Sequence, residues 1–298
     1  MRPINVFVKL GGSFITDKAV TDSLKGSRIT AAARMLSKAV ALAARRGRPI
    51  RLVLGHGAGS YGHILAKKYA AVQGVHPKHG WEGLFRIRES MTRMNLEFVR
   101  HCNRGGLFPV TVSPFAIARA KDGSLSGIET GCIESLLERG QVALLHGDVV
   151  LDSERGFTIA STEALLKALS RHVRFDRIVM VSDTDGVLDS AGATIPRLRH
   201  ADLGRLGRVV GGSAAPDVTG GMRGKVAELL AILARGGGQA RIMRCDGRAE
   251  NLLNAVLGEG GGGTLIQAEQ VRFNAVPCAP RHEVSGRHRP AKRGGRTS

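Results

Sequence analysis

The sequence predicts an α/β protein, an open αβα sandwich with a largely parallel central sheet. Short apolar segments alternate along the chain with longer segments of helical periodicity. The apolar segments lack the polar alternation of a strand with one face in water, so we expect helices to cover both faces of the sheet. Glycine-rich breaks follow the apolar segments. Ligands of such sheets bind beyond the carboxyl ends of the strands, which is where these breaks lie.

The expected elements alternate in chain order. The expected strands are residues 6–10, 51–54, 141–145 and 177–181. The expected helices are residues 29–46, 84–103, 130–139, 162–170 and 221–235. One segment departs from the alternation, because two apolar runs within 149–159 flank a polar turn. That pattern predicts a hairpin.

Composition excludes several classes of protein. No apolar run approaches the ~18 residues of a membrane span, and the N-terminus has no charged region followed by an apolar one. The four cysteines, at 102, 132, 245 and 278, are far apart without a Cys-x-x-Cys pair. The sequence therefore does not support a zinc site or a disulfide framework, and we predict that no residue of the chain coordinates a metal ion. These features indicate a reduced, cytoplasmic protein without a membrane partner.

The net charge is 44 − 25 = +19, which permits an anionic partner. Residues 278–298 contain six Lys or Arg against one Glu and almost no apolar side chains. We expect a folded domain over residues 1–266 and a basic, disordered tail over 267–298. A nucleic-acid-binding protein is an alternative, but aromatic residues are only 4% and do not interleave with the basic runs. A nucleic-acid partner is therefore disfavoured.

The first glycine-rich break, Gly11-Gly12-Ser13, follows Lys9 at the end of the first expected strand. A lysine in an apolar strand is costly to bury unless its ammonium group meets an anion. Glycines beside it let backbone N–H groups approach a phosphate. By itself the segment fits a phosphate loop and a plain turn about equally well. It is not a Walker A loop, because that pattern is not found at a strand-to-helix turn.

The second break has four glycines in residues 55–62 and leads into a helical segment. This composition predicts a phosphate nest at a helix N-terminus. His56 and His63 flank the break. We expect His56 to form a local hydrogen bond. We expect His63, at the start of the helix, to donate to an anion held by the loop.

Two more segments lie at an expected strand end and an expected helix start. Ser182-Asp183-Thr184-Asp185-Gly186 follows the strand at 177–181, and residues 217–225 lead into the last helix. Acidic turns often only cap helices. Taken by itself, Lys225 fits a solvent-exposed residue on a helix. Together with the two earlier breaks, however, these segments predict an anion-binding site at one edge of the sheet.

The segments together resemble the amino acid kinase superfamily and, within it, the isopentenyl phosphate kinases. The resemblance covers residues 4–266 and leaves the basic tail unexplained. Five motifs match in order and in approximate spacing, which makes the resemblance highly specific. They are Lys9 to Ser13 with Lys18, Gly55 to His63, His146-Gly147-Asp148, Ser182 to Val187, and Asp217 to Lys225.

The resemblance implies an ATP-dependent kinase that phosphorylates isopentenyl phosphate, a small phosphate monoester, to isopentenyl diphosphate. ATP and Mg²⁺ are the implied cofactors, and a homodimer is the implied assembly. Residues 1–170 would form an acceptor-binding lobe and residues 171–266 a nucleotide-binding lobe. A hydrophobic cavity between Tyr69 and the helix at 84–103 would hold the five-carbon tail.

The resemblance also implies roles for individual residues. Phosphoryl transfer between anions needs positioning and positive charge, which lysines supply. The implied catalytic residues are Lys9, Lys18 and His63. The implied ATP-binding residues are Lys9, Gly11, Gly12, Ser13, Ala58, Asp183, Gly186, Gly220 and Lys225. The implied acceptor-binding residues are Gly57, Gly62, His63, Ser161 and Thr162.

Two positions depart from the family pattern. Glu163 stands where relatives carry an aspartate that orients the lysines, and Ala58 stands where many have a glycine. The closest alternative enzyme is a fosfomycin-type phosphonate kinase, which shares the fold, the glycine loops and the histidine. The volume of the tail pocket separates these two enzymes, and the sequence does not determine it.

Overall fold

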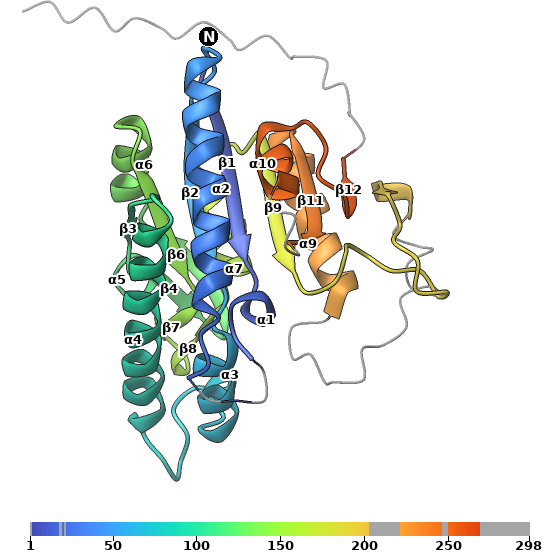
Figure 1. Cartoon of the computed structure of the whole chain (residues 1–298). Helices are drawn as coiled ribbons and strands as arrows, with labels where there is room; N and C mark the ends of the chain where they lie inside the picture. Colours follow the sequence, from blue (N-terminus) through green and yellow to red (C-terminus); the bar gives the residue numbers. More distant parts are fainter. Residues whose placement is uncertain (1, 18–19, 21, 203–220, 246–249, 269–298) are drawn as a thin grey trace, which may run out of the picture.

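The computed structural model describes residues 2–17, 20, 22–202, 221–245 and 250–268. Its central feature is an eight-stranded sheet (Figure 1). Among the described strands of this sheet, only β11 and β12 pair in antiparallel fashion, which confirms the expected largely parallel sheet. In spatial order the strands are β10 (Arg197–Leu198), β12 (Thr264–Ile266), β11 (Gln239–Arg244), β9 (Arg177–Ser182), β1 (Ile4–Leu10), β2 (Ile50–His56), β6 (Val142–His146) and β3 (Pro109–Thr111).

Helices cover both faces of this sheet, as expected (Figure 1). One layer contains α2 (Gly26–Arg45), α4 (Glu82–Arg104) and α10 (Glu250–Leu257), with α3 (Gly59–Lys68) against α4. The other contains α6 (Gly131–Glu138), α7 (Thr162–Leu169) and α9 (Gly221–Gly236).

Side chains of β1 alternate between the two layers. Val6 and Val8 pack in the core with α2, whereas Phe7 packs in the core with α7 and α9. Because the side chains of a strand have a period of two, Lys9 lies on the face of Phe7. The alternation therefore directs this lysine toward α7 and α9.

A four-stranded sheet lies beside the carboxyl end of the main sheet. It contains β5 (Ser124–Ile128), β4 (Ala118–Lys121), β7 (Asp148–Asp152) and β8 (Gly156–Ala160). The hairpin of β7 and β8 confirms the prediction for residues 149–159, whereas the hairpin of β4 and β5 was not predicted. The remaining short elements are α1 (Gly12–Ile15), α5 (Pro114–Ile117), η1 (Ala71–Gln73) and η2 (His200–Asp202).

Two boundaries in the second glycine-rich break differ from the sequence prediction. Strand β2 continues through Gly55 and His56, and α3 begins at Gly59. The loop between them is therefore only Gly57 and Ala58. The expected basic tail lies almost entirely outside the described residues. Within the described residues, no helix is long and apolar enough to cross a membrane.

Candidate active site

The parallel pairing of β1, β2, β6 and β9 brings their carboxyl ends to one edge of the sheet. The first two glycine breaks touch each other there. A Cβ on Gly12 would lie 2.7 Å from the Gly59 nitrogen, and a Cβ on Gly57 would lie 2.7 Å from the Gly12 nitrogen. Glycine at these positions thus allows two backbones to meet. This packing reason was not apparent from the sequence.

Lys9 forms an ion pair with Glu163 of α7 at this edge. Lys9 is 8% exposed, so its ammonium group is largely removed from water. Burial raises the pKa of Glu163, but the charge and hydrogen bond of Lys9 and the charge of Lys225 outweigh burial and hold that pKa below its ordinary value. Glu163 is therefore a carboxylate that pairs with Lys9 from β1 and is further stabilised by the charge of Lys225 from α9.

Asp183 follows β9 beside the first glycine break. The Ser13 hydroxyl donates to the Asp183 carboxylate at 2.9 Å. Gly186, a few residues further on, has a φ of +93°, and a Cβ there would lie 2.5 Å from the Thr264 hydroxyl oxygen. The structure thus brings Ser13 and Asp183 into contact. Gly186 is required for the turn against β12.

The N-terminus of α3 is held by Thr16. The Thr16 hydroxyl accepts a hydrogen bond from the Ser60 N–H at 3.1 Å and donates to the Gly12 carbonyl at 2.8 Å. Gly59 has a φ of +50°, and a Cβ there would collide with the Thr16 side chain. The Ser60 hydroxyl is buried without a hydrogen-bond partner among the described residues. A buried donor of this kind at a helix N-terminus fits an anionic ligand.

The predicted acceptor-binding residues have different surroundings. His63 is an exposed residue of α3. Gly62 allows α3 to approach α4, because a Cβ there would lie 3.1 Å from the Met91 sulfur. The Ser161 hydroxyl caps α7 by accepting from the Ala164 N–H at 3.1 Å. The Thr162 hydroxyl donates to the His56 carbonyl at 2.6 Å and thereby joins α7 to β2.

Two predicted site residues, Lys18 and Gly220, lie outside the described residues. Lys9, Gly11, Gly12, Ser13, Gly57, Ala58, Asp183 and Lys225 all come to the carboxyl edge described above. Their roles toward ligands stay predictions.

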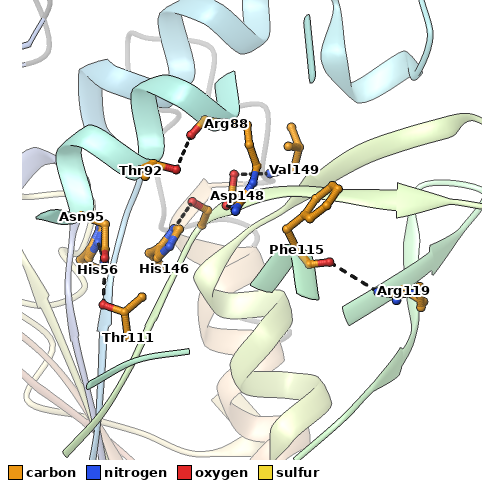
Figure 2. Close-up of polar contacts among 11 residues, drawn as sticks. His56, Arg88, Thr92, Asn95, Thr111, Phe115, Arg119, His146, Asp148 and Val149 are labelled. Carbon is orange, nitrogen blue, oxygen red and sulfur yellow. Dashed lines mark hydrogen bonds and ion pairs between the residues drawn. The ribbon is translucent and has the colours of Figure 1, made fainter. Parts of the chain in front are cut away.

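A buried polar network adjoins the loop of Gly57 and Ala58, and Figure 2 shows most of its side chains. His56 and His146 occupy the same register position on β2 and β6, and their rings stack at 5.2 Å. Asn95 of α4 contacts His56 Nε2 at 3.0 Å and accepts from the Thr111 hydroxyl at 2.8 Å. The expectation that His56 forms a local hydrogen bond is confirmed, since its Nδ1 lies 3.1 Å from the Gly57 carbonyl oxygen.

The pKa values of these histidines are low. Burial, reinforced by His146, lowers the pKa of His56 from 6.5 to about 3. Burial also lowers the pKa of His146, although Asp148 opposes this shift. Asp148 forms an ion pair with Arg88, yet burial raises its pKa. Both imidazoles are therefore neutral near pH 7.

The space between Tyr69 and α4 differs from the apolar cavity expected for it. A cavity of about 310 Å³ lies there, and charged side chains form most of its lining. The Tyr69 ring itself is buried, and its hydroxyl donates to Glu82 at 3.1 Å. Lys68 of α3 and Arg86 and Arg93 of α4 are among its lining residues, so this cavity is not hydrophobic. The hydrophobic cavity expected for the five-carbon tail stays a prediction.

The chain is similar to proteins of known family. The amino acid kinase family model matches residues 6–244. An isopentenyl phosphate kinase of Haloferax volcanii is 34% identical over 266 residues, covering 89% of this chain and 99% of the relative. Another, of Methanocaldococcus jannaschii, is 29% identical over 258 residues, covering 85% and 95%. A crystal structure of an isopentenyl phosphate kinase superposes with a TM-score of 0.72 at 26% identity, covering 88% of this chain and 100% of that one.

Proposed function

The chain belongs to the amino acid kinase family, and on that premise we propose that it transfers the γ-phosphoryl group of ATP to isopentenyl phosphate. The products would be ADP and isopentenyl diphosphate. The observation that supports this proposal most strongly is the largely buried ion pair of Lys9 and Glu163, whose carboxylate also feels the charge of Lys225, beside two touching glycine loops. Relatives named for this reaction match this chain along most of its length.

The geometry suits phosphoryl transfer between two anions. This reaction needs positive charge and exact positioning, and it needs no nucleophile from the protein. Lys9 and Lys225 would neutralise charge on the transferring phosphoryl group, and Glu163 would hold the Lys9 ammonium group in position. The first glycine break, with Ser13 and Asp183, would hold the ATP phosphates. The α3 N-terminus, with the buried Ser60 hydroxyl, would hold the acceptor's phosphate.

We also propose that Mg²⁺ enters with ATP and neutralises charge on its phosphates. Among the described residues, no group of three or more His, Cys, Asp or Glu forms a metal cage. Asp183, the residue that follows β9, is the acidic group that would contact a phosphate-bound cation. Mg²⁺ in phosphoryl-transfer sites is commonly held by one or two carboxylates and the substrate phosphates.

A homodimer is proposed through the edge strand β3 and the adjoining face of α4. Phe108, next to β3, is 68% exposed, and Leu96 of α4 is 52% exposed. Val110, on β3 itself, is also exposed. An unpaired strand edge bordered by apolar side chains favours pairing with a second copy. We place the dimer in the cytoplasm. A shift to monomer in Phe108→Glu during light-scattering chromatography would support this interface, and an unchanged mass would contradict it.

The reaction is tested by measuring ADP formation from Mg·ATP with a panel of acceptors. The panel contains isopentenyl phosphate, dimethylallyl phosphate, longer prenyl phosphates and fosfomycin. We expect the highest kcat/KM with isopentenyl phosphate, and isopentenyl diphosphate as product. Turnover of fosfomycin alone would contradict the proposed acceptor and leave the kinase assignment in place.

A further inference from the structure

The loop between β2 and α3 is only Gly57 and Ala58, and glycine gives it little conformational preference of its own. The peptide group between His56 and Gly57 is fixed by three hydrogen bonds. The Gly57 N–H donates to the Leu10 carbonyl at 3.0 Å, and the His56 carbonyl accepts from Thr162 and from the Gly147 N–H. The next peptide group, between Gly57 and Ala58, has its carbonyl oxygen against the His56 imidazole.

The donor and the acceptor of each hydrogen bond around His56 can be assigned. A carbonyl oxygen can only accept, so Nδ1 of His56 must donate to Gly57. If the ring is neutral, Nε2 is then an acceptor and takes a hydrogen bond from the Asn95 amide. The Asn95 oxygen in turn accepts from the Thr111 hydroxyl. The chain of donors runs from Thr111 through Asn95 and His56 to Gly57. Figure 2 shows the first three of these residues.

The opposite orientation of the Asn95 amide would turn its oxygen toward Nε2. Both ring nitrogens would then carry protons, and a fully buried imidazole would be charged. The environment opposes that state, since burial lowers the pKa of His56 to about 3. Asn95 and burial therefore favour the same tautomer, with the proton on Nδ1.

This tautomer determines where an N–H group of the loop points. In a trans peptide the C=O and the N–H point in opposite directions, so holding the Gly57 oxygen toward His56 turns the Ala58 N–H away from it. Ala58 caps α3 and lies against Gly12, where the two glycine loops touch. Under the proposed function, this junction is where the phosphoryl group passes from donor to acceptor.

We propose that His56 is a positioning residue, held by Asn95 as the Nδ1–H tautomer, which aims the Ala58 N–H at the phosphoryl group being transferred. This inference rests on the proposed function for its consequence in catalysis. The tautomer and the hydrogen bond to Gly57 can be tested independently of activity.

Two substitutions separate positioning from packing. In His56→Asn the amide nitrogen takes the position of Nδ1 and can still donate to Gly57. In His56→Gln the amide reaches the position of Nε2 and leaves the Gly57 carbonyl without this donor. Asparagine is the smaller residue and leaves the larger cavity, so packing alone would make His56→Asn the more damaging change.

We expect His56→Asn to retain most of the kcat/KM for isopentenyl phosphate and His56→Gln to lose about 10- to 100-fold, the usual worth of a hydrogen bond to a charged group. The KM for ATP should change much less in both variants. Urea unfolding should give the opposite order, with His56→Asn the less stable variant. Equal losses, or a more active His56→Gln, would overturn the proposal.

A second measurement uses the unaltered protein, in case neither variant folds. Long-range ¹H–¹⁵N spectra of the histidine rings report which nitrogen carries the proton. We expect a neutral His56 ring with its proton on Nδ1, and a proton on Nε2 would overturn the inference. If the unaltered protein gave this spectrum but no ADP from isopentenyl phosphate, the proposed function would fail while the tautomer assignment would hold.

Discussion

The buried imidazole of His56 predicts a specific loss of stability in acid. The folded protein holds this ring neutral with a pKa of about 3, whereas the unfolded chain has the ordinary value of 6.5. Between these two values the unfolded state binds more protons, so the free energy of unfolding falls as the pH falls through this window. Each pH unit below 6.5 removes about 1.4 kcal/mol, so acidification from pH 7 to pH 5 should remove about 2 kcal/mol through this residue.

The assay compares the unaltered protein with His56→Asn, in which this group cannot titrate. Urea unfolding is followed by circular dichroism at pH 7 and at pH 5 for both proteins. His172→Asn, a change at an exposed histidine, serves as the control. We expect His56→Asn to lose about 2 kcal/mol less than the unaltered protein on acidification. Equal losses in the two proteins would show that His56 is not held neutral, and the description of the network would be wrong.

Three further predictions concern the site. Lys9→Met and Lys225→Met should each lower kcat by about 100-fold or more and preserve the circular dichroism spectrum, because each removes charge needed in the transition state. Near-normal turnover by both variants would contradict the roles assigned to the two lysines. Gly57→Ala should lower the free energy of unfolding by about 1–3 kcal/mol, because its Cβ would lie 2.7 Å from the Gly12 nitrogen. Unchanged urea unfolding would show that the two glycine loops can move apart without loss of stability. His63→Ala should lower kcat/KM for isopentenyl phosphate by a factor equivalent to about 1.5–3 kcal/mol, and His63→Gln should recover part of that loss. A raised KM for ATP with normal acceptor kinetics would indicate that helix α3 binds the nucleotide.

Long periodic segments made most of the fold predictable. The buried strands β1, β2, β6 and β9 and the five expected helices all occur, with ends shifted by a few residues. Strands β3, β10 and β12 are two or three residues long, too short to show a pattern. The β4–β5 hairpin has mostly exposed residues, so its sequence lacks a continuous apolar signal.

The site was predictable where a strand end coincided with an unusual residue. Lys9 was recognisable because it interrupts an apolar strand, and the structure supplies its partner, Glu163. The contacts of Asn95 with His56 and with Thr111 depend on helix α4 packing against the sheet, which no local pattern reveals. One signal was available: Asn95 is a polar residue on the buried face of α4, next to Met94 and three residues before Phe98.

The most direct test of the central claim follows the phosphorus atoms of the reaction. The full chain is incubated with Mg·ATP and isopentenyl phosphate, and ³¹P spectra are recorded with time, with Lys9→Met as the matched control. We expect the monoester signal to be replaced by the paired signals of a diphosphate, in step with the conversion of ATP to ADP and only in the unaltered protein. An unchanged monoester signal, or ADP formed together with free phosphate, would contradict the account.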